Sequence, residues 1–299
     1  METQMQGKTV LITGATSGIG QASAIGIAKL GAHVVVTGRD RARGERGVAE
    51  IKAESGNDNV DLMLADLSSM AKVRQIADEF KQRFNRLDVL INNVGYLSNQ
   101  RRETTEGIEM NLAVNHLAPF VLTHELLPLL KASAPSRVIN ITGGMPGQGG
   151  IDFDNLQAEK SFLGLTTYTH AKNVMMAVSY EFAKQLEGTG VRLVVAYPGS
   201  AQTDMTASLT PDMMPFIMRL LWPGMKLFAN VVMSSDPADA AVSTIRLASA
   251  PDSHVVNGAY YNTKGERAKW PKGLIKSGVP ERVWQVSQQL ISQKAYSTS

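Results

Sequence analysis

The sequence predicts a three-layer, doubly wound α/β fold with a mainly parallel seven-stranded sheet. Three observations support this prediction. Strand patterns and helical patterns alternate regularly along the chain. Most strand patterns are runs of Val, Ile and Leu that are too continuous for a sheet with one face in water. A glycine-rich turn joins the first strand to the first helix. Such alternation produces parallel strands covered by helices on both faces.

The individual elements follow from these patterns and from local boundary signals. Gly188 is suited to close a helix, and Asp236 followed by Pro237 is suited to open one. No linker interrupts the alternation, so residues 1–299 are expected to form a single domain. Strands are expected at 8–13, 33–37, 60–65, 87–92, 137–141, 191–197 and 259–261. Helices are expected at 18–30, 40–54, 69–84, 104–131, 166–187 and 237–249, with a C-terminal helix at about 279–293.

The turn after the first strand has the sequence TGATSGIG and carries glycines at positions 14, 18 and 20. Glycine permits positive φ and lets backbone N–H groups approach a ligand closely. The positive end of the following helix dipole points at the same place, which favours a phosphate there. The alternative is an ordinary tight turn. Because this turn begins a series of strands and helices, the sequence favours phosphate binding.

Composition excludes several classes of protein. The chain is 43% hydrophobic and 19% charged, which suits an ordinary globular core. A net charge of +3 is too small to indicate a nucleic-acid surface. The absence of cysteine rules out disulfides and thiolate metal sites, and the five histidines lack metal-ligand spacing, so no metal is expected. The polar residues before the first strand leave no room for a signal or membrane anchor, which suggests a cytoplasmic protein.

In an open parallel sheet, ligands bind beyond the carboxyl ends of the strands. The residues just after each expected strand therefore describe one elongated site. They are Gly14 to Gly20, Arg39, Asp66-Leu67, Asn92 to Gly95, Thr142 to Gly144 and Pro198-Gly199.

These motifs together resemble the short-chain dehydrogenase/reductase family, whose fold is the Rossmann fold. The resemblance rests on TGATSGIG, Asp66-Leu67, NNVG, Asn115 in VNHLAPF, Tyr168-x-x-x-Lys172 and Pro198-Gly199. The segments RVINIT, IDFDNLQAEK, GTGVR and GAYYNTKGERAKWP are similar to the retinol-dehydrogenase-like branch. The likeness covers nearly the whole chain.

The resemblance implies a dinucleotide cofactor and a set of residues that bind it. Gly14, Gly18 and Ile19 would line the pyrophosphate, with Thr16 and Ser17 in the same turn. Asp66 and Leu67 would contact the adenine, and Asn92 and Gly95 the ribose side. Pro198, Gly199 and Thr203 would lie near the nicotinamide, with Thr203 at its carboxamide.

Arg39 follows the second strand, where enzymes that use NAD commonly carry an acidic residue. An arginine at this position suits a 2′-phosphate, so the sequence favours NADP(H) as the cofactor. The alternative is that Arg39 is one solvated charge in the mixed run of charges that ends at Arg46.

Tyr168 and Lys172 are four residues apart on an expected helix and therefore share one face. A free tyrosine has a pKa of about 10, and a neighbouring ammonium lowers it. Tyr168 is thus a plausible acid/base, with Lys172 lowering its pKa and contacting the ribose. The family pattern implies that Asn115 supports a water relay.

One position departs from the family pattern. The serine that normally ends the fifth strand and holds the substrate oxygen is replaced by Gly143. Thr142 could take its place only if the strand end shifts register, because neighbouring side chains point to opposite faces. Alternatively Tyr168 acts alone, or the substrate or a water supplies the bond. A lost donor of this kind costs about 3 to 4 kcal/mol.

An insertion at about 200–235 is rich in Met and large apolar residues. We expect a lid over a lipophilic substrate; the alternatives are a peripheral patch that touches a membrane, or packed structure at a subunit contact. Interrupting charges argue against a membrane-spanning helix. The long helices at 104–131 and 166–187 resemble those that pair in family dimers and tetramers, which suggests a homodimer or homotetramer.

The sequence therefore predicts an NADP(H)-dependent oxidoreductase. It would move hydride between the nicotinamide and a carbonyl or alcohol carbon of a lipophilic small molecule, with no nucleic-acid partner. Two alternatives stay open. One is an atypical member that reduces a conjugated double bond or an imine, and the other is a non-catalytic nucleotide-binding sensor or interaction protein.

Overall fold

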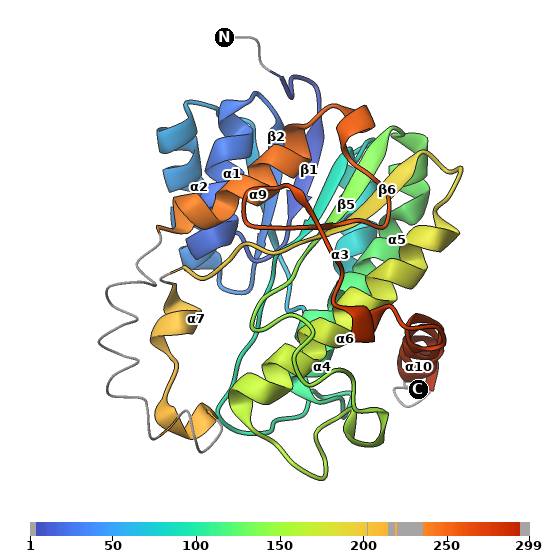
Figure 1. The fold of residues 1–299 in the computed structure, drawn as a ribbon. Coiled ribbons are helices and arrows are strands. Elements are labelled where there is room, and N and C mark those ends of the chain that lie inside the picture. The colour runs from blue at the N-terminus through green and yellow to red at the C-terminus, as the bar shows by residue number, and fades with distance from the viewer. Residues whose placement is uncertain (1–3, 202, 215–218, 220–235, 294–299) are drawn as a thin grey trace.

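The computed structural model describes residues 4–201, 203–214, 219 and 236–293. Its centre is one eight-stranded sheet with the strand order β3-β2-β1-β4-β5-β6-β7-β8 (Figure 1). The first seven strands run parallel and β8 pairs antiparallel with β7. The strands are β1 Thr9–Ile12, β2 His33–Gly38, β3 Val60–Leu64, β4 Val89–Asn92, β5 Ser136–Ile141, β6 Val191–Ala196, β7 Tyr260–Tyr261 and β8 Arg267–Ala268.

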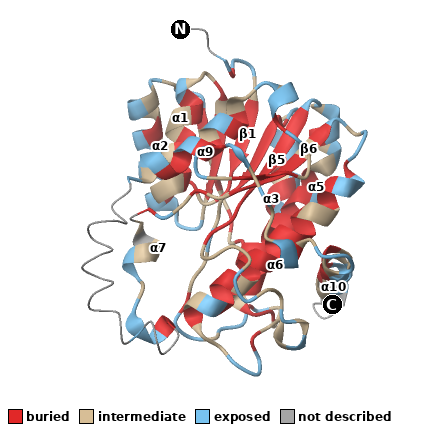
Figure 2. Cartoon of the chain, viewed as in Figure 1, coloured by how far each residue is buried: buried red, intermediate tan, exposed pale blue. Residues whose placement is uncertain are grey.

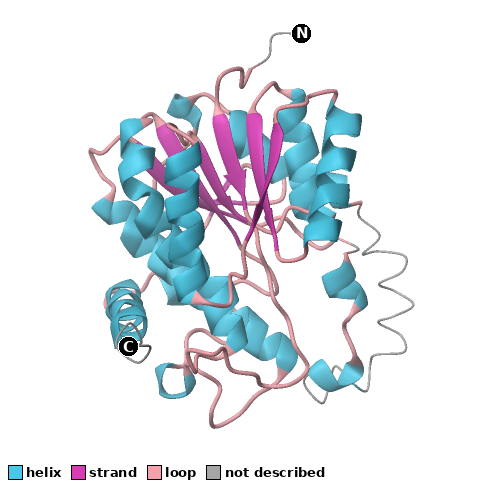
Figure 3. Cartoon of the chain, turned by 180° about the vertical axis from the view of Figure 1, so that it is seen from behind, coloured by secondary structure: helices cyan, strands magenta, loops and turns pink. Residues whose placement is uncertain are grey.

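Helices cover both faces of the sheet, as Figures 1 and 3 show from opposite sides. The predicted three-layer, doubly wound fold is therefore confirmed. One face is covered by α1 Gly18–Lys29, α2 Arg41–Ser55 and α9 Pro237–Ser249. The other is covered by α3 Met70–Arg83, α5 Ala118–Ala132 and α6 Gly164–Gln185, and α10 Val279–Gln293 packs on α6.

The strands are buried from both sides, which explains their continuous apolar sequences. In Figure 2 the sheet is almost entirely red, the colour of buried residues. Along β1 the side chains alternate between the two layers: Val10 and Ile12 pack with α1 and α9, whereas Leu11 packs with α3 and α5. Each face of the sheet therefore needs its own apolar partner helices.

Two helix starts carry the capping groups that their sequences indicate. The carboxylate of Asp236 accepts a hydrogen bond from the N–H of Ala238 (2.9 Å), one residue beyond the proline that opens α9. The carboxylate of Asp40 accepts from the N–H of Arg43 (2.7 Å) at the start of α2. Both contacts satisfy N–H groups that the helix itself leaves unpaired.

Two expectations about the elements are wrong. The helix expected at 104–131 begins only at Met110 and comprises α4 Met110–Leu112, a π-helix Ala113–Leu117 and α5. Gly107 has a left-handed φ of 65°, and the carboxylate of Glu109 caps the N–H of Leu112 (2.8 Å), so the preceding residues form a loop. The sheet also has an eighth strand, β8, which is too short to leave a periodic pattern.

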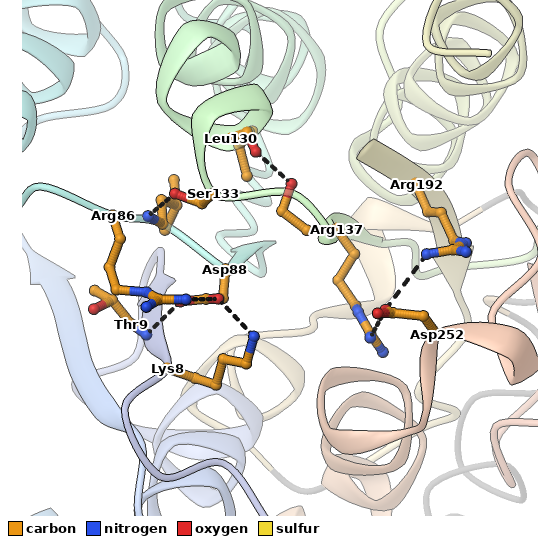
Figure 4. A network of polar contacts seen from close by, with 11 residues as sticks. Lys8, Thr9, Arg86, Asp88, Leu130, Ser133, Arg137, Arg192 and Asp252 are labelled. Carbon is orange, nitrogen blue, oxygen red and sulfur yellow. Dashed lines mark hydrogen bonds and ion pairs between the residues drawn. The ribbon is translucent and has the colours of Figure 1, made fainter. Parts of the chain in front are cut away.

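The amino ends of the strands are joined by ion pairs on the edge opposite the expected site (Figure 4). Asp88 is almost fully buried and accepts hydrogen bonds from Lys8 Nζ (2.9 Å), the N–H of Thr9 (2.9 Å) and Arg86 Nη2 (2.6 Å). Burial alone would raise the pKa of Asp88, but these hydrogen bonds outweigh it and lower the pKa. The charged carboxylate therefore stabilises the fold.

We predict that Asp88→Asn lowers the free energy of unfolding by about 2 to 3 kcal/mol near neutral pH, because charge-assisted hydrogen bonds are lost in a buried place. Because the folded-state pKa lies below the unfolded value near 4, the contribution is complete above that value and disappears as the pH falls below it. Urea denaturation at several pH values measures the difference.

The matched control is Asp78→Asn, which removes an exposed pair with Lys81 and should cost under about 1 kcal/mol. Equal losses in the two variants, or a difference from the wild type that grows in acid, would contradict the assignment.

Candidate active site

The glycine-rich turn lies between β1 and the amino end of α1. Gly18 has a φ of 58°, and a Cβ there would lie 3.2 Å from Cγ2 of Thr203. The first turn of α1, GIGQ, carries no acidic side chain. The hydroxyl of the N-cap residue Ser17 accepts a hydrogen bond from Arg43 Nη2 (2.7 Å) rather than capping the helix. The donors of this turn therefore fit a phosphate.

Polar contacts fix the turn to the ends of neighbouring strands. The hydroxyl of Thr13 accepts from the N–H groups of Asn93 (3.1 Å) and Val94 (3.2 Å), after β4. Asn93 Nδ2 in turn donates to the carbonyls of Thr13 (3.0 Å) and Gly14 (3.1 Å), and the N–H of Gly14 donates to Thr37 Oγ1 (3.2 Å) at the end of β2. The side chain of Asn93, one of the residues expected after the fourth strand, thus holds the glycine-rich turn against the end of β4.

Arg39 and Asp66 come together at the ends of β2 and β3. Arg39 is exposed. Burial alone would raise the pKa of Asp66, but hydrogen bonds from the hydroxyl (2.7 Å) and N–H (3.0 Å) of Ser68, together with the charge of Arg39, outweigh it and lower the pKa. Leu67 is buried in the core. Arg43, in the first turn of α2, follows Arg39 by four residues and contacts the glycine-rich turn through Ser17. It was missed as a site residue because it belongs to a run of exposed charges.

The side chain of Asn92 is buried between the sheet and α5. It is 2% exposed, and its Nδ2 donates to Asn140 Oδ1 (2.7 Å) and Thr123 Oγ1 (3.2 Å). Its amide therefore links β4 to β5 and α5. We infer that any contribution of Asn92 to a cofactor site comes from its backbone.

The remaining expected cofactor residues lie along the same edge of the sheet. Gly95 is exposed after β4, and a Cβ there would lie 3.5 Å from the sulfur of Met205. Pro198 is buried after β6, and Gly199 follows with a φ of 82°. Thr203 lies against Gly18, as described above. The segment after β6 therefore contacts the glycine-rich turn through Thr203 and Gly18.

Lys172 on α6 is buried and bound to the ends of two strands. Its Nζ donates to the carbonyl of Ile141 (3.0 Å), the last residue of β5, and to the carbonyl of Val94 (3.3 Å), just after β4. Its side chain is 3% exposed, and burial lowers the pKa of Lys172 to about 7. The ammonium is therefore easily deprotonated and is held at a fixed place.

Tyr168 lies one turn earlier on α6 and is also buried. Burial raises the pKa of Tyr168, and the nearby Tyr197 raises it further. Burial and Tyr197 set the shift of this pKa, so the expectation that Lys172 lowers it stays a prediction. Tyr168 is a protonated phenol over the physiological range.

Gly143 leaves the space that Tyr168 occupies. A Cβ on Gly143 would lie 2.4 Å from the phenol oxygen, far inside van der Waals contact. The phenol thus fills the position of the missing side chain. Thr142 is 2% exposed, and its Oγ1 has no hydrogen-bond partner among the described residues. Two residues earlier, Asn140 reaches Ser179 on α6 (2.8 Å), so the alternation of β5 directs Thr142 towards the α6 layer.

Asn115 is fully buried in the π-helix. Its Oδ1 accepts from the N–H of Tyr96 (2.9 Å) and its Nδ2 donates to the carbonyl of the same residue (2.8 Å). This two-point contact fixes the π-helix to the loop after β4. The side chain of Asn115 is therefore a structural clamp beside the site.

The glycine-rich loop after β5 is held by Asn173, which sequence reasoning missed. Asn173 is fully buried on α6, next to Lys172. Its Oδ1 accepts from the N–H of Gly147 (2.8 Å), and its Nδ2 donates to the carbonyls of Gln148 (2.9 Å) and Gly150 (3.1 Å). One amide thus fixes the loop that follows Gly143.

The insertion expected at about 200–235 lies largely outside the described residues. Its described part contains α7 Asp204–Ala207 and a short 3₁₀-helix, Pro211–Met213. Met213 and Met214 are buried, and Met213 packs against Gly164 at the start of α6. Apolar side chains therefore adjoin the end of α6 that carries Tyr168.

The described ranges contain neither a membrane-spanning helix nor a cluster of metal ligands. No helix among these residues is long and apolar enough to cross a membrane. Within the same part of the chain, no group of three or more His, Asp or Glu side chains is placed to hold a metal ion.

The chain is similar to a known family and to several known proteins. The family model for short chain dehydrogenases matches residues 8–214. Retinol dehydrogenase 14 of Mus musculus is 36% identical over 297 residues, covering 96% of this chain and 86% of that protein. Retinol dehydrogenase 12 of Mus musculus is 34% identical and covers 96% and 87%. The Pseudomonas aeruginosa RhlG/NADP active-site complex has a TM-score of 0.68 and 26% identity, covering 89% and 98%.

We predict that Gly143→Ala lowers the free energy of unfolding by about 1 to 3 kcal/mol, because the new methyl group displaces a buried phenol. Thermal unfolding followed by circular dichroism measures the loss as a lower Tm. The matched control is Gly273→Ala, where a Cβ would meet nothing within 4 Å. If both variants melt at the wild-type temperature, the phenol does not occupy the place that we assign to it.

Proposed function

The chain belongs to the short-chain dehydrogenase family, and from this premise we propose that it is an NADP(H)-dependent reductase of lipophilic carbonyl compounds. The observation that carries the proposal is the protonated Tyr168 phenol, held beside the buried Lys172 ammonium at the carboxyl ends of β4 and β5. The phosphate turn lies at the same edge of the sheet, after β1. The proposed proton donor, Tyr168, and the proposed dinucleotide site therefore lie at the same edge of the sheet.

The cofactor residues are proposed from the donors at this edge. The turn with Gly14, Thr16, Ser17, Gly18 and Ile19 would receive the pyrophosphate. Asp66 and the backbone of Leu67 would adjoin the adenine, and Asn92, Gly95, Pro198, Gly199 and Thr203 would line the path to the nicotinamide. Arg39 and Arg43 supply two positive charges beside the adenine end, which suits a 2′-phosphate. The neighbour bound to NADP supports this choice.

The chemistry assigns each catalytic residue one task. NADPH supplies the hydride when it is bound. Tyr168 would donate its proton to the oxygen of a carbonyl substrate, so that the reduced product would be an alcohol. Its raised pKa keeps it in the acid form that reduction needs. Lys172 and Asn115 keep the phenol and the neighbouring backbone in place, and Thr142 has no assigned bond to the substrate.

The substrate class is proposed from the apolar wall and from the relatives. Met205 adjoins Gly95 and Met213 adjoins Gly164 at the start of α6, and flexible thioether side chains adapt to apolar ligands. The relatives named retinol dehydrogenases support a lipophilic substrate. A second candidate is a conjugated carbonyl reduced at its double bond, which the lack of a hydroxyl at Gly143 favours.

The cytoplasmic location and the self-association stay predictions. Pairing through α5 and α6 has to leave room for α10, which already packs on these helices.

We predict that Arg39→Ala raises the KM for NADPH about 10-fold to 100-fold and changes the KM for NADH little, because it removes a charge-assisted contact with a 2′-phosphate. The matched control is Arg41→Ala, which removes a neighbouring exposed charge that faces Glu45. Steady-state kinetics with both cofactors measure the effect. An equal rise for NADH and NADPH would reject the role of Arg39.

The experiment that tests the function follows NADPH consumption with a panel of lipophilic ketones, aldehydes and enones. Turnover by the wild type is expected to fall at least about 100-fold in Tyr168→Phe, since the acid is removed. NADPH binding, followed by fluorescence, should stay within about twofold because the phenol is not a phosphate contact. Binding without turnover by the wild type, or turnover that survives the substitution, would contradict the proposal and favour a binding protein or another acid.

A further inference from the structure

The C-terminal helix α10 is anchored by an aromatic cluster on α5 and α6. The indole of Trp284 packs edge-on against Phe120 (5.0 Å between ring centroids) and Phe182 (5.1 Å), and His124 completes the cluster at 6.4 Å. Val283 beside it is 1% exposed. Figure 1 shows α10 lying across α6 at the edge of the molecule. The last described helix is therefore an integral part of the core.

One polar contact extends from α10 into the π-helix. Ser287, one turn beyond Trp284, has its hydroxyl 2.8 Å from Nε2 of His116, and both side chains are 1% exposed. The same hydroxyl donates its single proton to the carbonyl of Val283 (2.6 Å). Ser287 therefore accepts from His116, which fixes the imidazole proton on Nε2.

His116 is a neutral structural donor. Burial, together with the charge of His170, lowers the pKa of His116 to about 3. The ring stays uncharged across the physiological range, so the contact persists at constant strength. A pH-sensitive switch is thereby excluded for this pair, and its role is positional.

The π-helix gains its shape from contacts of two consecutive residues. Its widened turn is closed by the bond from the N–H of Ala118 to the carbonyl of Ala113, five residues earlier. Asn115 is bound to the backbone of Tyr96 at 2.9 and 2.8 Å, and His116 is bound to Ser287. A single π-turn is a rare, locally unfavourable geometry that occurs mostly at functional sites. Two side-chain anchors hold it here.

We propose that Ser287 and His116 are positioning residues that make α10 a support of the active site. Their contact keeps the π-helix wound so that Asn115 stays on the Tyr96 backbone, beside Gly95 and the carbonyl that holds Lys172. Without it, the π-turn relaxes towards an α-helical turn, which turns Asn115 away from Tyr96. The catalytic consequence rests on the proposed function, whereas the structural coupling does not.

The test compares Ser287→Ala with Ser292→Ala, an exposed serine on the same helix whose hydroxyl bonds to the carbonyls of Gln288 and Gln289 in its own helix. Hydrogen exchange at the amides of residues 113–117 is expected to accelerate roughly tenfold in Ser287→Ala alone. The kcat of carbonyl reduction is expected to fall at least about tenfold, because a small displacement of catalytic groups is costly. The KM for NADPH should change by less than about twofold.

A second variant, His116→Phe, removes the same hydrogen bond from the other side. The double variant with Ser287→Ala should be no slower than the worse single variant, since both remove one interaction. Additive losses, or wild-type exchange and kcat in Ser287→Ala, would overturn the proposal. If the wild type itself lacks turnover while Ser287→Ala still accelerates exchange, the proposed function fails and the positional coupling stands.

Discussion

The buried amino group of Lys172 is the constraint on which the site depends. A polar group removed from water is costly unless it is hydrogen bonded, and here the carbonyls of Val94 and Ile141 accept its hydrogen bonds. Those carbonyls lie at the ends of the neighbouring strands β4 and β5, so the two hydrogen bonds fix the position of α6 relative to the sheet. Tyr168 is placed by the same contact, and the next residue, Asn173, fixes the glycine-rich loop. One turn of α6 thus sets the phenol, the ammonium and the loop together.

Burial, rather than charge, decides the chemistry of the phenol. Tyr168 lies so close to Gly143 that its oxygen fills the space of a side chain there. This enclosure raises the pKa of Tyr168 and lowers that of Lys172 to about 7, because each uncharged form is favoured away from water. The resulting pair is an acid and a weakly basic amine, which is the state that suits proton donation to a substrate oxygen. Gly143 therefore lacks the hydroxyl of a serine, but its small size is also required to leave room for the Tyr168 phenol.

Much of the fold was predictable because its signals are local. Apolar runs marked the strands, the glycine turn marked the first βα junction, and Asp236 with Pro237 marked the start of α9. Two kinds of feature were not predictable: elements too short to leave a periodic pattern, and elements whose sequence has the pattern of another structure. The two residues of β8 leave no period, and the π-helix at 113–117 has the apolar spacing of an ordinary helix. The loop before Met110 depends on the cap from Glu109, a contact that only the tertiary arrangement shows. Because ligands bind beyond the carboxyl ends of parallel strands, the sequence could indicate which motifs lie at the expected site. The burial of the Asn92 side chain and the contacts of Arg43, Asn93 and Asn173 depend on side-chain partners, which the sequence does not show.

The most direct test of this account is a crystal structure of the protein with NADPH bound. The pyrophosphate is expected on the turn between Gly14 and Ile19, the 2′-phosphate against Arg39, and the nicotinamide facing the Tyr168 phenol. A cofactor bound elsewhere, or a nicotinamide ring directed away from Tyr168 and Lys172, would contradict it.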